Sequence, residues 1–436
     1  MTQGFARATD WFGQPRGLTV LFLTEMWEKF SFFGMRALLV FYMTKQLAFT
    51  GAKASLIYGL YAAFVYFTPI IGGAISDRWL SRRTGVILGG SIMALGHFLM
   101  AFPPLLFVAL ATIAVGNGLY LPNLPSQIDQ LYEREDPRRG SAYNVYYVGI
   151  NLGAFLAPLV CGTLGELYGW HLGFGAAGVG MCLGLATYIL GGRWLPADTG
   201  RSPQAAASGK TRPKSDNGLR LRVLGGVLLS VVVFRGAYEQ IGNSVALWAD
   251  ADVNRSFGSF VAPASWFQSL NPLLIFLLTP VLVTLWTVAA QRGRASSALQ
   301  KMALGAVGLA LSYLFLAGVS YLCRTAGVKP PAMALATFIT GLSLAELFIL
   351  PIGLGLFSRL AAEGYRATMI AAWFLAAFFG NLLAGYLGSF WSSVSHESFF
   401  AGMAGVALIA AAGLRVLDGP AQTVEADHLA QERAET

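Results

Sequence analysis

The chain has 436 residues, of which 55% are hydrophobic and only 12% charged, and its mean hydropathy is +0.58. A soluble globular protein carries roughly 25% charged residues, and one this poor in charge would expose large apolar patches and aggregate. The net charge of +8 comes from short basic clusters between apolar runs, which does not favour a nucleic-acid partner. The composition instead indicates a helical membrane protein, and its 51 glycines suit closely packed helices.

Apolar stretches long enough to cross a bilayer follow one another along the chain. In chain order they are 17–44, 54–76, 84–103, 105–130, 141–164, 170–192, 223–248, 266–290, 299–322, 332–357, 365–391 and 398–416. The residues before the first stretch lack the apolar core and cleavage site of a signal peptide, so we expect that stretch to be retained. The sequence therefore predicts an all-α membrane protein with twelve transmembrane helices.

The distribution of basic residues predicts the orientation of these helices. Of the 30 Lys and Arg residues, 22 fall on the side of the N-terminus and five in the loops on the other side. Because cytoplasmic loops carry the excess of Lys and Arg, both termini are expected in the cytoplasm, with the helices in the inner (plasma) membrane.

A polar segment rich in Pro, Ser, Gly and basic residues, 194–222, is typical of a cytoplasmic linker. It separates a predicted N-terminal six-helix bundle, 1–193, from a C-terminal one, 223–416, and a polar cytoplasmic tail, 417–436, is expected to be disordered. Two six-helix halves around a linker resemble the major facilitator fold, which implies a central cavity with substrate between the halves.

Charged residues stand out inside the first span, where each costs about 2.5–3.5 kcal/mol on insertion scales. Their spacing puts Glu25, Glu28, Lys29 and Arg36 along one helix face. Such a face must look into the bundle or a water-filled cavity, which favours a transport site or a proton relay. Mutual neutralisation of Glu25 and Lys29, an i,i+4 pair, is the structural alternative.

Three more charges lie in later spans: Arg235 and Glu239 in 223–248, and Glu346 in 332–357. Glu346 has no basic residue nearer in sequence than Arg359, so it is expected to be isolated. Among the seven core charges, four acids (Glu25, Glu28, Glu239 and Glu346) face three bases (Lys29, Arg36 and Arg235). An excess carboxylate could take up a proton or accommodate a substrate ammonium.

Other chemistry finds no support in the sequence. Cys161, Cys182 and Cys323 have neither disulfide nor zinc spacing, and no P-loop, HExxH or GxSxG motif is present. We therefore expect no enzyme activity, no metal and no cofactor, with a proton gradient as the driving force.

Several motifs recur along the chain in a characteristic order. The first span contains EMWEKFSFFG from Glu25 onward, and the fifth contains YYVGINLG from Tyr146 onward. The C-terminal half adds Tyr238-Glu239-Gln240, Asn271-Pro272, Ala345-Glu346-Leu347, and Trp373 with Gly380-Asn381. In order and spacing these motifs resemble the proton-dependent oligopeptide transporter (POT, or PTR) family through nearly the whole chain. The first is similar to the family's ExxERFxYYG and the second to its FYxxINxG.

The resemblance implies roles for residues of this chain. Proton coupling would rest on Glu25, Glu28 and Lys29, and a gating salt bridge would join Arg36 to Glu239. Substrate binding would involve Tyr66, Asn151, Arg235, Asn271, Glu346, Trp373 and Phe374. Within that set, Glu346 would hold the ammonium of the peptide.

Departures from the family pattern concern positive charge and hydroxyl groups. Lys29 replaces an arginine, Phe32 and Phe33 replace tyrosines, and Leu121 stands where the family commonly has lysine. Arg235 stands where tryptophan is common. It either restores part of the missing positive charge or only pairs with Glu239, and both hypotheses stay open at this point.

The resemblance therefore implies proton-coupled symport of di- and tripeptides by alternating access, by a protein that functions as a monomer in the lipid bilayer. A major facilitator carrier of another solute, such as an anion or a drug-like zwitterion, is the first alternative. A membrane enzyme and a passive channel are the others. An enzyme would need a nucleophile–base pair or a metal cluster, and a channel would show no proton dependence.

Overall fold

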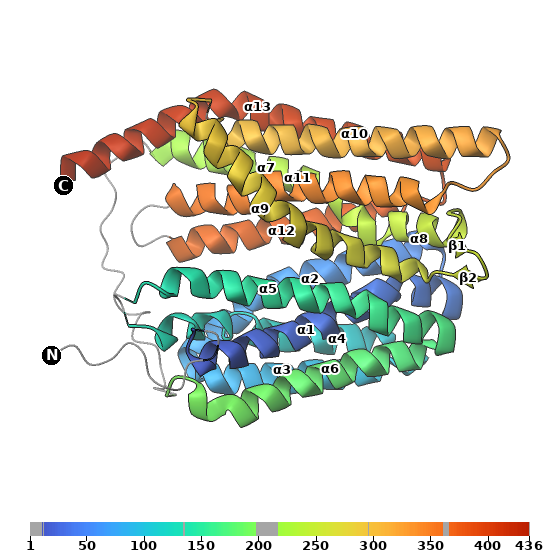
Figure 1. The fold of residues 1–436 in the computed structure, drawn as a ribbon, viewed down its shortest axis with the longest axis horizontal. Coiled ribbons are helices and arrows are strands. Elements are labelled where there is room, and N and C mark those ends of the chain that lie inside the picture. The colour runs from blue at the N-terminus through green and yellow to red at the C-terminus, as the bar shows by residue number, and fades with distance from the viewer. Residues whose placement is uncertain are drawn as a thin grey trace. The chain divides into compact units, whose positions relative to one another are not determined.

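The computed structural model describes residue 11 and residues 13–133, 136–197, 217–294, 296–360 and 366–435. These ranges are helical almost throughout, apart from a small antiparallel hairpin of β1 (Ser256–Phe257) and β2 (Phe260–Val261). Ten helical segments of the described chain are long and apolar enough to cross a membrane. The prediction of an all-α membrane protein is confirmed (Figure 1).

The chain divides into two compact units, of which the N-terminal unit comprises Met1–Leu47, Phe64–Ala205 and Pro263–Leu273. Its helices are α1 (Arg16–Phe41), α2 (Gly51–Trp79) from Phe64 onward, α3 (Arg82–Leu99), α4 (Leu106–Tyr120), α5 (Arg139–Ala157) and α6 (Trp170–Leu190). Two π-helical segments, Pro158–Gly162 and Leu164–Tyr168, prolong α5. Helix α1 packs against α5 and α6, and α3 packs against α4 and α6.

The C-terminal unit comprises Ala48–Ala63, Ala206–Ala262 and Leu274–Thr436. Its helices are the start of α2, α7 (Asn217–Tyr238), α8 (Ser244–Ala251), α9 (Leu270–Gln291) beyond Leu273, α10 (Ala298–Thr325), α11 (Ala332–Arg359), α12 (Arg366–Gly388) and α13 (His396–Glu435). Helix α10 packs against α11 and α13, and α7 packs against α12 and α13.

A helix lies at each of the twelve predicted spans, but α1 and α3 are not among the ten segments that qualify by length and composition. Five charged residues, Arg16 among them, reduce the apolar character of α1, and α3 begins with Arg82 and Arg83. The count of twelve transmembrane helices stays a prediction with which these helices agree.

The predicted domain boundaries meet the structure only in part. Residues 198–216, most of the predicted linker, lie outside the described residues, and α7 begins within the linker at Asn217. The expected disorder of the tail is wrong, because α13 continues to Glu435. Its continuation is anchored where Gln300 Nε2 of α10 donates to Asp418 Oδ2 at 2.8 Å. The assignment of 1–193 and 223–416 as bundles stays a prediction.

Candidate functional site

The N-terminal unit contains a buried charged cluster on α1. Lys29 Nζ lies 3.2 Å from Glu25 Oε1 and 2.6 Å from Glu28 Oε2. Glu25 is 1% and Glu28 0% exposed, whereas the Lys29 side chain is 14% exposed. The structure thus brings together the three residues predicted for proton coupling, as two acids around one base.

The surroundings of this cluster do not balance its charge. The hydroxyl groups of Tyr120 and Tyr146 lie near enough to interact electrostatically with both carboxylates. Within the described part of the chain, Glu28 Oε1 accepts no hydrogen bond. A buried carboxylate without a full partner is costly, and a single proton would neutralise the excess charge. The cluster is therefore suited to binding and releasing one proton.

Glycines fix the position of this charged helix. A Cβ atom at Gly153 of α5 would lie 2.1 Å from the Met26 carbonyl oxygen, and one at Gly180 of α6 would lie 2.5 Å from the Phe30 ring. Both contacts fall on the apolar side of α1, away from the face that carries Glu25 and Lys29. Because only glycine permits this approach, α5 and α6 hold α1 from its apolar side.

A second ion pair lies in the C-terminal unit at the end of α7. Arg235 Nη1 donates to Glu239 Oε1 at 2.9 Å, and the two side chains are 8% and 3% exposed. Directly after Tyr238 the α-helix gives way to a 3-10 turn, Glu239–Gly242. Of the two hypotheses for Arg235, pairing with Glu239 is the one for which the structure provides a contact.

Glu346 of α11 is not isolated as predicted. Tyr238 of α7 donates its hydroxyl hydrogen to Glu346 Oε2 at 2.6 Å, and its ring stacks on Phe234 with the ring centroids 5.7 Å apart. Sequence proximity could not reveal this donor, because 108 residues separate the two partners. The only signal in the sequence was that Tyr238 directly precedes Glu239 in the motif Tyr238-Glu239-Gln240.

The other predicted substrate-binding residues divide between the units. Tyr66, Asn151 and Asn271 belong to the N-terminal unit, and Trp373 and Phe374 to the C-terminal unit. The amide of Asn151 donates to the Tyr147 carbonyl of its own helix at 2.9 Å. Trp373 is buried against Phe357, with ring centroids 5.3 Å apart. Arg36 and Glu239 also belong to different units, so their salt bridge stays a prediction.

Sequence reasoning missed a polar network that follows the ion pair of α7. Gln240 Nε2 donates to the Ala384 carbonyl at 2.8 Å, and Ser244 Oγ donates to Gln240 Oε1 at 2.7 Å. Ser55 Oγ at the start of α2 donates to Asn243 Oδ1 at 2.9 Å. The signal available in the sequence was a group of three polar residues, at 240, 243 and 244, shortly after Arg235 and Glu239 in a largely apolar span.

It also missed Glu166, which follows α5 in a π-helical segment. The two carboxylate oxygens of Glu166 accept hydrogen bonds from the backbone N–H groups of Ala264 and Ser265, at 2.9 and 2.8 Å. These N–H groups begin a 3-10 turn, Ala264–Ser269, which leads directly into α9. No local pattern could indicate this contact, since its partners lie 98 and 99 residues away.

The described residues offer no group of three or more His, Cys, Asp and Glu side chains placed to hold a metal ion. The cluster on α1 offers two carboxylates and a lysine, with two tyrosine hydroxyls near enough to interact with the carboxylates.

Comparison with known proteins identifies the family. The family model described as the POT family matches residues 83–211 and 210–404. The chain belongs to the POT family. It is 31% identical to the di-/tripeptide transporter of Lactococcus lactis subsp. cremoris, over 89% of this chain and 92% of that protein. It is also 31% identical to the uncharacterized transporter YclF of Bacillus subtilis (strain 168), over 94% of each chain.

Solved structures of POT-family proteins share its architecture. A crystal structure of a peptide transporter POT in complex with sulfate matches with a TM-score of 0.87 and 30% identity, over 95% of this chain and 96% of that one. A crystal structure of a mutant peptide transporter POT in complex with alafosfalin matches with a TM-score of 0.85 and 29% identity, over the same shares. This POT-family chain therefore has the predicted major facilitator fold, and it is a transporter rather than an enzyme.

Proposed function

We propose that this POT-family protein carries di- and tripeptides across the plasma membrane together with protons, by alternating access and as a monomer, with both termini in the cytoplasm. The buried cluster of Glu25, Glu28 and Lys29 carries this proposal. Its two acids and one base leave one negative charge that a proton can neutralise, 2.6–3.2 Å from a lysine that stays within the cluster.

The charges of the C-terminal unit support a peptide over an anion as substrate. Arg235 is engaged by Glu239, and Glu346 accepts a hydrogen bond from the Tyr238 hydroxyl. Leu121 of the N-terminal unit brings no charge. A carboxylate in a low-dielectric site attracts the α-ammonium of a peptide and repels an anion.

Uptake of a labelled dipeptide into proteoliposomes, with and without an inward proton gradient, tests the proposal. We expect the wild type to concentrate the peptide only with the gradient. Glu25→Gln and Glu28→Gln should each abolish gradient-driven uptake while the protein still inserts and folds, because they remove proton exchange and keep side-chain shape. Counterflow, which needs no net proton movement, should survive at least in part.

Glu133→Gln is the matched control, since Glu133 is an exposed carboxylate outside the membrane spans. Concentrative uptake at the wild-type rate in both Glu25→Gln and Glu28→Gln would contradict the assignment of proton coupling to this cluster. Dipeptide uptake by the wild type at the same rate with and without the proton gradient would favour a passive channel.

A further inference from the structure

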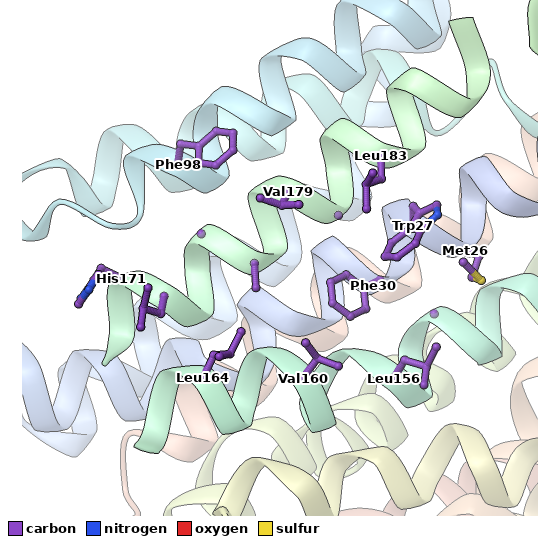
Figure 2. A pocket seen from close by; sticks show the side chains of 15 residues that line it. Met26, Trp27, Phe30, Phe98, Leu156, Val160, Leu164, His171, Val179 and Leu183 are labelled. Carbon is purple, nitrogen blue, oxygen red and sulfur yellow. The ribbon is translucent and has the colours of Figure 1, made fainter. Parts of the chain in front are cut away.

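A groove of about 600 Å³ opens on the side of α1 that bears no charge (Figure 2). Residues of α1, α3, α5 with its π-helical extension, and α6 line it, and all belong to the N-terminal unit. Among the described residues that line the groove, His171 at one end is the one ionisable side chain, and the others are apolar side chains and glycines. The groove is therefore an apolar channel with one polar end.

The groove has room because a side chain is missing. A Cβ atom at Gly175 of α6 would meet nothing within 4 Å. Gly180, on the same helix, is different, because a Cβ atom there would strike Phe30. Gly175 thus leaves open space, whereas Gly180 serves helix packing.

The position of the groove identifies the source of its occupant. Its walls on the side of α5 and α6 belong to the membrane spans Arg139–Tyr168 and Trp170–Trp194. Val160, Val179 and Leu183 on its rim are 42%, 51% and 43% exposed, so the groove continues the apolar surface that this membrane protein presents to lipid. The occupant must come from the bilayer, as a lipid chain or as a helix of another protein.

Size decides between a lipid chain and a helix. His171 and Leu183 lie twelve residues apart on α6, or about 18 Å at 1.5 Å per residue. A helix of that length and of 10 Å diameter would fill about 1,400 Å³, more than the groove can hold. A single acyl chain is thinner and can lie along more than half of the hydrocarbon core, which is about 30 Å thick.

We propose that the groove binds one acyl chain of a phospholipid, with the phosphate group near His171. The polar end lies at the beginning of α6, beside Tyr168 and Trp170, and such aromatic residues are typical of the membrane–water interface. An imidazole N–H there can donate a hydrogen bond to a phosphate oxygen.

The bound chain packs directly behind the proton-binding cluster. Met26, Trp27 and Phe30 form the α1 wall of the groove, whereas Glu25 and Lys29 project from the opposite face of the same helix. The lipid chain therefore completes the apolar support that α5 and α6 give to α1.

A phospholipid with a photoreactive diazirine in the middle of one acyl chain, in nanodiscs with the full-length protein, tests this assignment. Adducts should concentrate on peptides of α1, α5 and α6 that line the groove. Gly175→Leu should lower their yield about tenfold, which corresponds to about 1.4 kcal/mol. Gly308→Leu on α10 is the matched control, because Gly308 also faces open space but does not line this groove.

Adducts spread evenly over all lipid-facing helices, or a yield that Gly175→Leu leaves unchanged, would overturn the proposal in favour of unselective lipid contact. Protein–protein cross-links through the groove would overturn it in favour of a second chain. An equal yield from a labelled free fatty acid would overturn the claim that a phospholipid headgroup binds near His171. If Gly175→Leu does not fold, Leu183→Ala removes part of the wall without adding bulk, and it should also lower the yield.

Discussion

At the scale of single residues, the buried charges are paired mainly within their own helices. Glu25 with Lys29, and Arg235 with Glu239, are both i,i+4 pairs with N–O distances of 3.2 and 2.9 Å. Pairing inside one helix places opposite charges next to each other, which offsets part of their desolvation cost. Glu28 also contacts Lys29, at 2.6 Å, and Glu346 accepts a hydrogen bond from Tyr238 of another helix. We expect proton binding at Glu28 and ammonium binding at Glu346.

Glu346 provides the first prediction. Replacing Glu346 with Gln keeps the shape of the side chain and removes its charge, so dipeptide binding should weaken by about 1.5–3 kcal/mol, the scale of a hydrogen bond to a charged group. An N-acetylated dipeptide has no ammonium to bind, so it should bind the wild type poorly and be little affected by the substitution. Competition binding of both peptides to both proteins measures the effect.

Glu425→Gln is the control for this experiment, because Glu425 is a carboxylate of α13 that pairs at 3.3 Å with the exposed side chain of Arg359. If acetylation left the affinity of the wild type unchanged, Glu346 would not be an ammonium site, and the case for a peptide substrate would weaken with it.

At the scale of elements, the start of α9 depends on contacts with the end of α5. The first N–H groups of a helix have no partner within the helix, and Glu166 accepts two of them with a favourable charge. Trp266 Nε1 adds a hydrogen bond to Thr163 Oγ1 at 2.8 Å, and Ser269 Oγ donates to the Phe155 carbonyl at 2.8 Å. These contacts hold residues 263–273 in the N-terminal unit.

Glu166→Ala should therefore loosen the start of α9. The substitution leaves two partly buried N–H groups without acceptors, at a cost of about 1–3 kcal/mol each. Amide hydrogen exchange at Ala264 and Ser265 should accelerate strongly, and the melting temperature should fall. Glu133→Ala, at an exposed site, should change neither, and unchanged exchange in Glu166→Ala would show that the carboxylate does not cap this turn.

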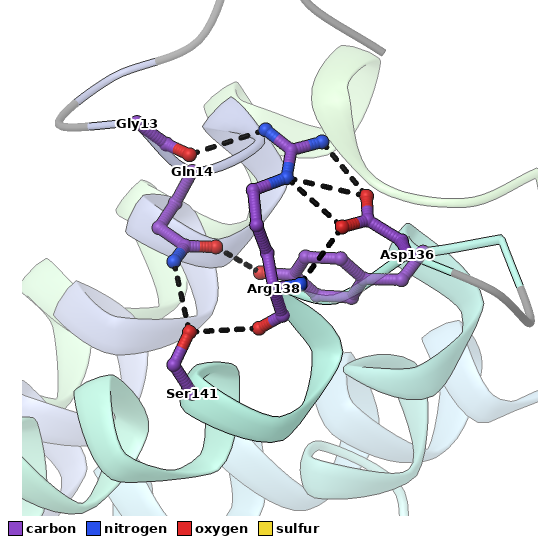
Figure 3. Close-up of polar contacts among 6 residues, drawn as sticks. Gly13, Gln14, Asp136, Arg138 and Ser141 are labelled. Atoms are coloured by element: carbon purple, nitrogen blue, oxygen red, sulfur yellow. Dashed lines mark hydrogen bonds and ion pairs between the residues drawn. The ribbon is translucent and has the colours of Figure 1, made fainter.

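A second contact between elements joins the segment before α1 to the loop before α5 (Figure 3). Arg138 binds both carboxylate oxygens of Asp136, with Nη2 2.8 Å from Oδ2, and donates to the Gly13 carbonyl at 3.1 Å. Tyr132 donates to Gln14 Oε1 at 2.8 Å. The hydrogen bonds from Arg138 lower the pKa of Asp136 below its ordinary value of 3.8.

This lowered pKa sets the pH dependence of the contact. Because the folded protein favours the ionised carboxylate, the stabilisation is fully present above the ordinary pKa and is lost as pH falls through the lower folded value. The melting temperature of the wild type should exceed that of Asp136→Asn at neutral pH, and the difference should shrink in acid below pH 3.8. Arg138→Gln is the control background. There, adding Asp136→Asn should change the melting temperature little at neutral pH, because the hydrogen bonds from Arg138 are already absent. A difference that persists in strong acid would contradict the assignment.

At the scale of the whole molecule, the predicted site residues are shared between two units, seven in one and five in the other. Transport by alternating access requires that charge changes in one unit affect the other. Glu239 stands between two arginines. It pairs with Arg235 of its own unit, and Arg36 of the other unit is its predicted gating partner.

A comparison of the two arginines separates stability from gating. Arg235→Ala should lower the free energy of unfolding by about 3–5 kcal/mol, because it removes the cation that lies 2.9 Å from the buried Glu239 carboxylate. Arg36→Ala should impair uptake at a smaller cost in stability, and the swap of Arg36→Glu with Glu239→Arg should recover some exchange. A double-mutant cycle on uptake measures the coupling. Additive effects at Arg36 and Glu239 would contradict the gate and leave Arg235 as the partner of Glu239.

The sequence by itself determined the fold class, the positions of the helices and the charged face of α1. Each of these depends on local spacing: the length of an apolar run, or residues three and four apart on one helix. The cluster of Glu25, Glu28 and Lys29 was predictable for this reason, and so was the pairing of Arg235 with Glu239.

Only the tertiary structure decided the partners that come from other helices. Tyr238 meets Glu346 across 108 residues, and Glu166 meets the start of α9 across 98. Gln300 and Ser297 of the chain before and within α10 bind Asp418 of α13, and the groove depends on how the helices around Gly175 pack. The physical reason is the same in each case: these contacts follow from which helix faces pack together, and a span of apolar residues carries little information about its neighbours.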